Sequence, residues 1–177
     1  MNELRPLSGS RVELRPLTAD AVAAWIEGDR AAVGHLTGAV FPDPPVAPPL
    51  MDDALPFMRD RLREHPDEVG LWAWLCVLET TGEVVGSAGF GGRPDSDGLL
   101  VLGYAMYPGF AGMGYASETA ALLAEWGLTQ PGVRGIRVTA QTTNPASLRV
   151  AAKAGFVEVG KTDDPEVGEL IVLERRS

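Results

Sequence analysis

The chain has 177 residues, with 15 Lys and Arg against 24 Asp and Glu, so its formal net charge is −9. The length is that of one domain, and the acidic balance argues against a general nucleic-acid binder, which would carry a basic face. The lone cysteine, Cys76, excludes an intrachain disulfide. With no long apolar run and no signal-like start, we expect one domain over 1–177, cytoplasmic and without a membrane span.

The first third of the chain predicts one strand and two helices around a proline-rich segment. Residues 11–15 alternate apolar and charged side chains, as a half-buried strand does. Thr18 can cap a helix over 19–27, and apolar spacing predicts a second helix over 52–64 if Pro56 lies in its first turn. The intervening segment 41–49 is either a stiff connector or a rigid rim of a substrate pocket.

The rest of the chain changes from paired strands to alternating strands and helices. Residues 71–78 read as a central strand with Trp72, Trp74 and Cys76 on one face, and the turn at 80–83 predicts a hairpin with 84–90. Further along we expect strands at 99–106, 133–141, 156–159 and 169–174, and helices at 115–126 and 145–154. This order predicts an α/β (α+β) fold, a mixed sheet with helices on both faces.

Two short segments could carry chemistry. Gly109, Gly112 and Gly114 lie between a strand and a helix, where backbone N–H groups can gather around phosphate oxygens or simply form a tight turn. The spacing is neither that of a P-loop nor that of a dinucleotide-binding turn. Asn144 and Ser147 begin a later helix; they are good capping residues, and they could equally face a ligand between two strands.

With these two motifs in this order, the chain resembles the GNAT acetyltransferase superfamily, and within it the RimJ/RimL-type N-acetyltransferases. The resemblance covers nearly the whole chain and rests on an opening strand, a central hairpin and two motifs in order. These are Leu14-Arg15-Pro16-Leu17, Val84–Phe90, Leu102-Gly103-Tyr104 with Gly112-Met113-Gly114-Tyr115-Ala116, and Asn144-x-x-Ser147 with Lys153-Ala154-Gly155-Phe156.

The resemblance implies a mostly antiparallel mixed sheet that splays open between 99–106 and 133–141 to hold acetyl-CoA, with no metal. Pantetheine would bond the backbone of Tyr104, Ala105 and Met106, and also Asn144. The pyrophosphate would lie on the amides of Ala111, Gly112, Met113, Gly114, Tyr115 and Ala116. Ser147, beside the cofactor, would protonate the leaving thiolate, and the Met106 N–H would stabilise the oxyanion.

Three positions depart from the family pattern. Ala111 stands where Arg or Gln is usual, Val101 where many relatives have Glu, and Ala151 where other members place a tyrosine acid. These departures favour Ser147 as the acid and leave the base unassigned. Glu118 is ordinary in a first helical turn, where it complements the helix dipole.

The resemblance therefore implies transfer of acetyl from acetyl-CoA to a primary amine by direct attack in a ternary complex. The acceptor would be a protein or peptide N-terminus or a small amine, with a possible homodimer and no nucleic-acid or membrane partner. Two alternatives remain open at the level of sequence. One is a catalytically weak acyl-CoA sensor or partner-binding module, and the other an acyltransferase that uses another donor such as succinyl-CoA.

Overall fold

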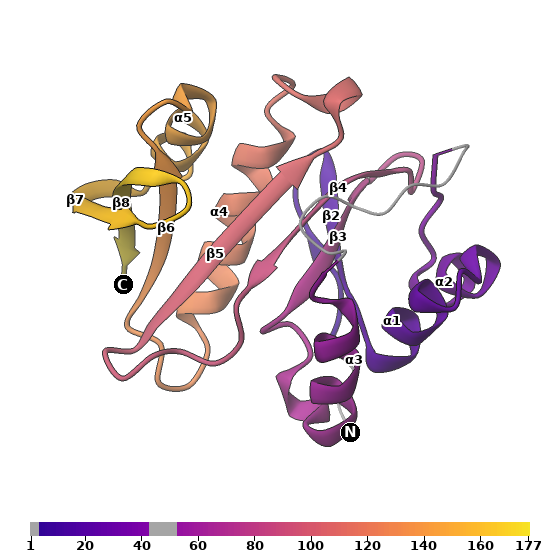
Figure 1. Cartoon of the computed structure of the whole chain (residues 1–177). Helices are drawn as coiled ribbons and strands as arrows, with labels where there is room; N and C mark the ends of the chain where they lie inside the picture. The colour runs from indigo at the N-terminus through magenta and orange to yellow at the C-terminus, as the bar shows by residue number, and fades with distance from the viewer. Residues whose placement is uncertain (1–3, 43–52) are drawn as a thin grey trace.

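An eight-stranded sheet runs through the residues that the computed structural model describes, 4–42 and 53–177, in the order β1-β2-β3-β4-β5-β6-β8-β7. Helices cover both of its faces (Figure 1). The strands are β1 (Leu7–Ser8), β2 (Val12–Pro16), β3 (Ala73–Leu78), β4 (Val84–Phe90), β5 (Leu99–Met106), β6 (Gly135–Gln141), β7 (Val157–Asp164) and β8 (Gly168–Arg176). The helices are α1 (Ala19–Ile26), α2 (Arg30–Thr37), α3 (Leu55–Glu64), α4 (Tyr115–Leu128) and α5 (Pro145–Lys153), with short 3₁₀ turns η1 (Pro66–Glu68) and η2 (Pro108–Phe110).

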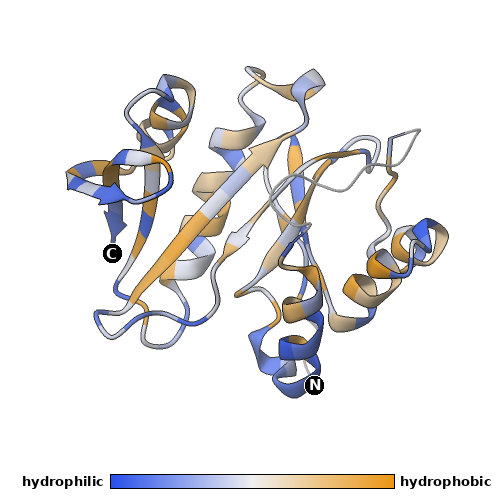
Figure 2. Ribbon diagram, viewed as in Figure 1, coloured by the Kyte–Doolittle hydropathy of each residue, from blue (hydrophilic) through white to orange (hydrophobic). Residues whose placement is uncertain are grey.

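The sheet opens between β5 and β6. β5 and β6 form a parallel pair, whereas the other neighbouring strands pair antiparallel. The parallel pairing covers Leu99, Leu100 and Val101 of β5 and ends there. β5 is hydrophobic along this paired part and less so towards its end (Figure 2). The mostly antiparallel, splayed sheet that the family resemblance implies is thus confirmed.

Each face of the sheet buries its own apolar cluster. On one face α4 packs against the sheet, and Leu14, Trp74, Leu123 and Ile136 lie in one cluster. On the other face α1 and α3 cover β3 and β4, and the cluster includes Val22, Met58 and Leu75. The alternation of side chains along β3 sends Trp74 to one cluster and Leu75 to the other.

Most predicted elements are present, and two short ones were missed. β4 and β5 have the predicted bounds, and Thr18 caps α1 by accepting from the Ala21 N–H. α3 begins at Leu55 with Pro56 in its first turn. Sequence analysis missed β1 and α2, and the predicted 156–159 and 169–174 are the longer strands β7 and β8. α2 has an ordinary N-cap in Asp29 and is followed by Gly38 at φ 66°, but its weak apolar pattern hid it.

The predicted rim of the substrate pocket falls mainly on residues 43–52, outside the described residues. His35 is exposed on α2, and His65 is the C-cap residue of α3.

The prediction that Trp72 shares a face with Trp74 and Cys76 is wrong. Trp72 precedes β3 and packs against the cluster under α1 and α3, whereas Trp74 and Cys76 lie in the other cluster. The Trp72 indole N–H donates to Glu68 at 3.0 Å. Because Trp72 lies before the strand and bonds Glu68, its side chain does not follow the two-residue alternation of side chains along β3.

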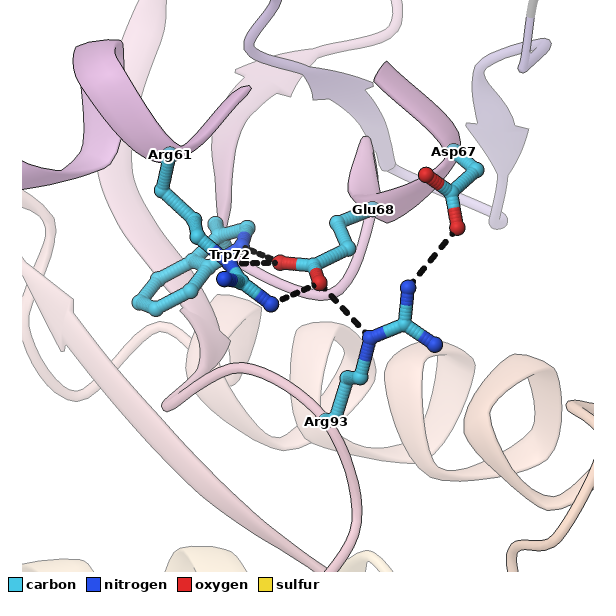
Figure 3. Close-up of polar contacts among 5 residues, drawn as sticks. All are labelled: Arg61, Asp67, Glu68, Trp72 and Arg93. Carbon is cyan, nitrogen blue, oxygen red and sulfur yellow. Dashed lines mark hydrogen bonds and ion pairs between the residues drawn. The ribbon is translucent and has the colours of Figure 1, made fainter. Parts of the chain in front are cut away.

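Glu68 is a fully buried carboxylate held by side chains from three segments (Figure 3). Arg61 of α3 donates from Nε and Nη2, and Arg93, which follows β4, donates from Nε at 2.6 Å. Arg93 also reaches Asp67 at 2.8 Å. The hydrogen bond from Arg61, with those from Arg93 and Trp72, lowers the pKa of Glu68 to about 2 against the opposing effect of burial. This cluster ties α3 and η1 to the central strands.

Candidate functional site

A groove of about 530 Å³ lies where the sheet opens. It is bordered by the end of β5, the glycine turn that follows, the start of α4, and α5. Its lining residues are Tyr104, Ala105, Met106, Phe110, Ala111, Gly112, Gly114, Tyr115, Ala116, Ser117, Asn144, Ala146, Ser147, Arg149, Val150 and Lys153. The two motifs singled out in the sequence therefore lie on one groove.

The end of β5 presents backbone groups to the opening. The N–H of Tyr107, just past the strand, donates to the carbonyl of Val85 on β4 at 2.9 Å. Backbone groups of successive strand residues point to opposite edges, so those of Tyr104 and Met106 point away from β4, towards β6. Pairing with β6 ends at Val101, which leaves this edge facing the groove. The Met106 N–H thus points to the open edge of the sheet.

The glycine turn places backbone groups without side chains at the groove. Gly112 has φ 77° and Gly114 has φ 85°, the left-handed region that a side chain disfavours. Gly114 is the N-cap of α4 and supplies no side-chain capping bond. The first N–H groups of a helix lack intrahelical partners, so an uncapped N-terminus of this kind suits an anion.

Asn144, Ser147 and Tyr104 meet across the groove. The Asn144 side-chain oxygen accepts from the Ser147 N–H at 3.1 Å, so Asn144 caps α5 as its position suggested. The Tyr104 hydroxyl donates to the Ser147 carbonyl at 3.2 Å and lies 3.5 Å from the Ser147 Oγ. Burial raises the pKa of Tyr104, while its hydrogen bond with Ser147 opposes the shift. The tyrosine therefore links β5 to the start of α5 as a neutral hydroxyl.

The structure brings together the predicted site residues with one exception. Met113 is absent from the residues described as lining the groove; its carbonyl instead accepts from Arg11 Nη1 at 2.9 Å. Sequence reasoning missed Arg149 and Lys153, which add two positive charges to the α5 side of the groove. They follow Ala146 by three and seven positions, so helical spacing would have found them once α5 was known to face the groove.

Two further residues, Glu118 and Cys76, have structural roles. Glu118 of α4 accepts from the backbone N–H groups of Arg11 and Val12 at 2.7 and 3.2 Å. Burial alone would raise the pKa of Glu118, but these bonds and those from Ser10 lower it. Cys76 is fully buried, and burial raises the pKa of its thiol to about 12, so it is an inert packing residue.

The family model described as "Acetyltransferase (GNAT) domain" matches residues 11–157. This chain belongs to the GNAT acetyltransferase family. An uncharacterized N-acetyltransferase from Bacillus subtilis, YjdG, is 27% identical over 154 residues, which cover 85% of this chain and 89% of the relative. The chain is accordingly an acyltransferase enzyme.

Solved structures of GNAT proteins have the same fold. RimL, the ribosomal L7/L12 α-N-protein acetyltransferase, in complex with coenzyme A aligns with TM-score 0.66 and 16% identity over 97% of this chain and 98% of its own. A Salmonella typhimurium acetyltransferase described as modifying the N-terminal serine of L7/L12 aligns with TM-score 0.65 and 14% identity, covering 98% and 99%. At these identities the likeness shows the fold alone.

The residues on the groove fit a GNAT acyl-CoA site. The uncapped start of α4 and the glycine turn provide N–H donors for phosphate, and Arg149 and Lys153 provide charge that Ala111 does not. Among residues 4–42 and 53–177, no group of three or more His, Cys, Asp or Glu side chains is arranged to hold a metal ion. Nor does any helix of this part of the chain have the length and apolar character that a membrane crossing requires.

Proposed function

We propose that this GNAT enzyme transfers an acetyl group from acetyl-CoA to a primary amine within a ternary complex. The supporting observation is the single groove that joins the open edge of β5, the uncapped start of α4 and the pair Asn144 and Ser147. Each of these parts alone has a structural explanation. Together they match the thioester, pyrophosphate and pantetheine of one extended ligand.

Different residues of the groove would have different roles in the reaction. Bound acetyl-CoA would supply the activated acyl group, and the Met106 N–H would stabilise negative charge on the thioester oxygen. The Ser147 hydroxyl would give a proton to the departing thiolate, and the proton that the attacking amine loses would restore the hydroxyl. Asn144 uses its side-chain oxygen for capping, so its NH₂ group remains to donate to the pantetheine arm. The Tyr104 hydroxyl would fix Ser147 relative to β5.

For the acceptor, we favour an α-amine of a protein or peptide, with small amines as the second class. The ribosomal-protein acetyltransferases with the same fold support this choice. The acceptor would enter from the side of α1 to α3, opposite the phosphate turn, because the turn and α5 occupy the other side of the opening.

The test is calorimetric titration of the purified protein with acetyl-CoA, using succinyl-CoA and ATP as comparators. We expect saturable binding of acetyl-CoA and none of ATP, followed by release of free thiol with peptide amines. Tighter binding of succinyl-CoA than of acetyl-CoA would indicate that the enzyme uses another acyl donor. Acetyl-CoA binding without thiol release across a panel of peptides and small amines would contradict acetyl transfer.

A further inference from the structure

Arg11 lies against the glycine turn although more than 100 positions separate them in the sequence. Its Nη1 donates to the Met113 carbonyl at 2.9 Å, and its guanidinium carbon lies 5.0 Å from the centre of the Tyr115 ring. A Cβ at Gly114 would lie 3.0 Å from Arg11 Nη2. The guanidinium therefore spans the turn and the beginning of α4, from outside the groove lining.

Glu118 fixes the place of Arg11 through both backbone and side chain. Its Oε1 accepts from the Arg11 and Val12 N–H groups, and its Oε2 pairs with Arg11 Nε at 3.2 Å. The Glu118 side chain is 15% exposed and that of Arg11 51% exposed. The start of β2 is thus fastened to the first turn of α4, and the remaining donors of the guanidinium are directed to the turn.

The contact with Met113 acts on the groups that face the groove. A donor on the Met113 carbonyl polarises the peptide bond to Gly114, which strengthens the N–H of Gly114 as a donor. It also holds the turn in the conformation that the positive φ angles of Gly112 and Gly114 define. Ala111 brings no cation to this turn, and the cations that line the groove, Arg149 and Lys153, come from α5.

We propose that Arg11 is a positioning residue for the phosphate end of acyl-CoA. It fixes the glycine turn through the Met113 carbonyl and puts positive charge behind that turn, where Ala111 supplies none. The inference rests on the proposed function, because it assigns Arg11 to the same groove. It predicts that losing Arg11 weakens recognition of phosphate and leaves recognition of the pantetheine arm unchanged.

The test compares Arg11→Gln and Arg11→Ala with the wild type by calorimetric titration with CoA. The affinity for S-acetylpantetheine, which has no phosphate, is measured by competition with CoA. We expect CoA affinity to fall about tenfold in both variants, the scale of one hydrogen bond to a charged group. S-acetylpantetheine affinity should change less than twofold. The CoA affinity of Arg11→Lys should lie between that of the wild type and that of Arg11→Gln, because lysine keeps the positive charge but lacks the planar guanidinium.

Arg15→Ala is the matched control. Arg15 lies on β2, the strand that Arg11 directly precedes; it pairs with Glu13 and donates to the Thr37 carbonyl at 3.2 Å, but it does not contact the turn. CoA affinity should be unchanged in this variant. Equal loss of affinity for CoA and S-acetylpantetheine in Arg11→Gln would overturn the inference in favour of a general structural role, as would wild-type CoA affinity. A wild type that binds no acyl-CoA would instead overturn the proposed function, and this inference with it.

Discussion

The groove side of the molecule and the side under α1 to α3 differ in how much of their structure rests on local contacts. At the groove, local features set out most of the site: Asn144 caps a helix through a residue three positions away, and Gly112 and Gly114 shape one turn, while Tyr104 and Arg11 add contacts to distant segments. Under α3, Glu68 is held by Arg61 and Arg93, which are 7 and 25 positions away. Local contacts leave a signature in residue spacing, whereas contacts between distant segments do not.

This difference suggests that the two sides can be damaged separately. A change in the Glu68 cluster should reduce the stability of the protein and leave the glycine turn intact. A change in the turn or at the start of α5 should alter ligand binding or turnover at a smaller cost in stability. The predictions below test this separation, beginning with the largest effect.

Glu68→Ala should lower the free energy of unfolding by about 3 kcal/mol. The substitution leaves Arg61, Arg93 and the Trp72 indole without their shared acceptor, and the lower end of the range for a broken buried pair applies because both arginines are partly exposed. Urea denaturation measures the loss. CoA affinity at a temperature where the variant is folded should stay within twofold of wild type. A large loss of affinity would show that the two sides are coupled.

The same carboxylate predicts a pH dependence. The pKa of Glu68 is about 2 in the folded protein against an ordinary 4.5, so the folded state favours the charged form. Its contribution is complete above the unfolded pKa and is lost as the pH falls from about 4.5 towards 2. Urea denaturation across this window should show a shallower pH dependence for Glu68→Gln. Equal slopes for variant and wild type would assign acid sensitivity to other carboxylates.

The sequence patterns predicted most strands of the sheet, and the resemblance to the GNAT superfamily implied its splay and the residues that lie around the groove. β5 and the start of α4 were placed correctly, because an apolar strand, a glycine turn and a helix follow one another without interruption. Neither α2 nor the face of the sheet on which Trp72 packs was predictable in this way. α2 has a single buried residue, Val33, and Trp72 is held by a partner on another element. Arg11 was missed because its partners are more than 100 positions away.

Ser147→Ala should reduce kcat by about 100-fold, the low end of the range for a general acid, since a thiolate is a good leaving group. CoA affinity should change little, because the Asn144 cap bonds the Ser147 backbone and survives the substitution. Ser147→Thr, which keeps a hydroxyl, is the matched control and should retain most of the activity. Unchanged turnover in Ser147→Ala would mean that solvent protonates the thiolate.

Gly114→Ala should weaken CoA binding by about 1–2 kcal/mol, because a side chain disfavours the left-handed backbone angles by that amount and the free turn would relax away from the conformation that binds CoA. Gly114 has φ 85°, and the new methyl group would lie 3.0 Å from Arg11 Nη2. Gly109→Ala in the same turn is the control: nothing lies within 4 Å of its Cβ position, and its φ is not positive. Calorimetry should separate the two variants. Equal affinities would show that the turn accommodates the methyl group without moving its amides.

Asn144→Ala should lower the free energy of unfolding by about 1 kcal/mol, less than Glu68→Ala, because it loses the cap of α5. If the Asn144 amide also donates to pantetheine, CoA affinity must fall further than this capping loss explains. Asn144→Asp separates the two effects, because a carboxylate still accepts from the Ser147 N–H but cannot donate. We expect Asn144→Asp to melt near the wild-type temperature and to bind CoA as weakly as Asn144→Ala. Wild-type affinity in Asn144→Asp would make Asn144 a purely structural cap, and the groove would then hold pantetheine through the backbone of β5 alone.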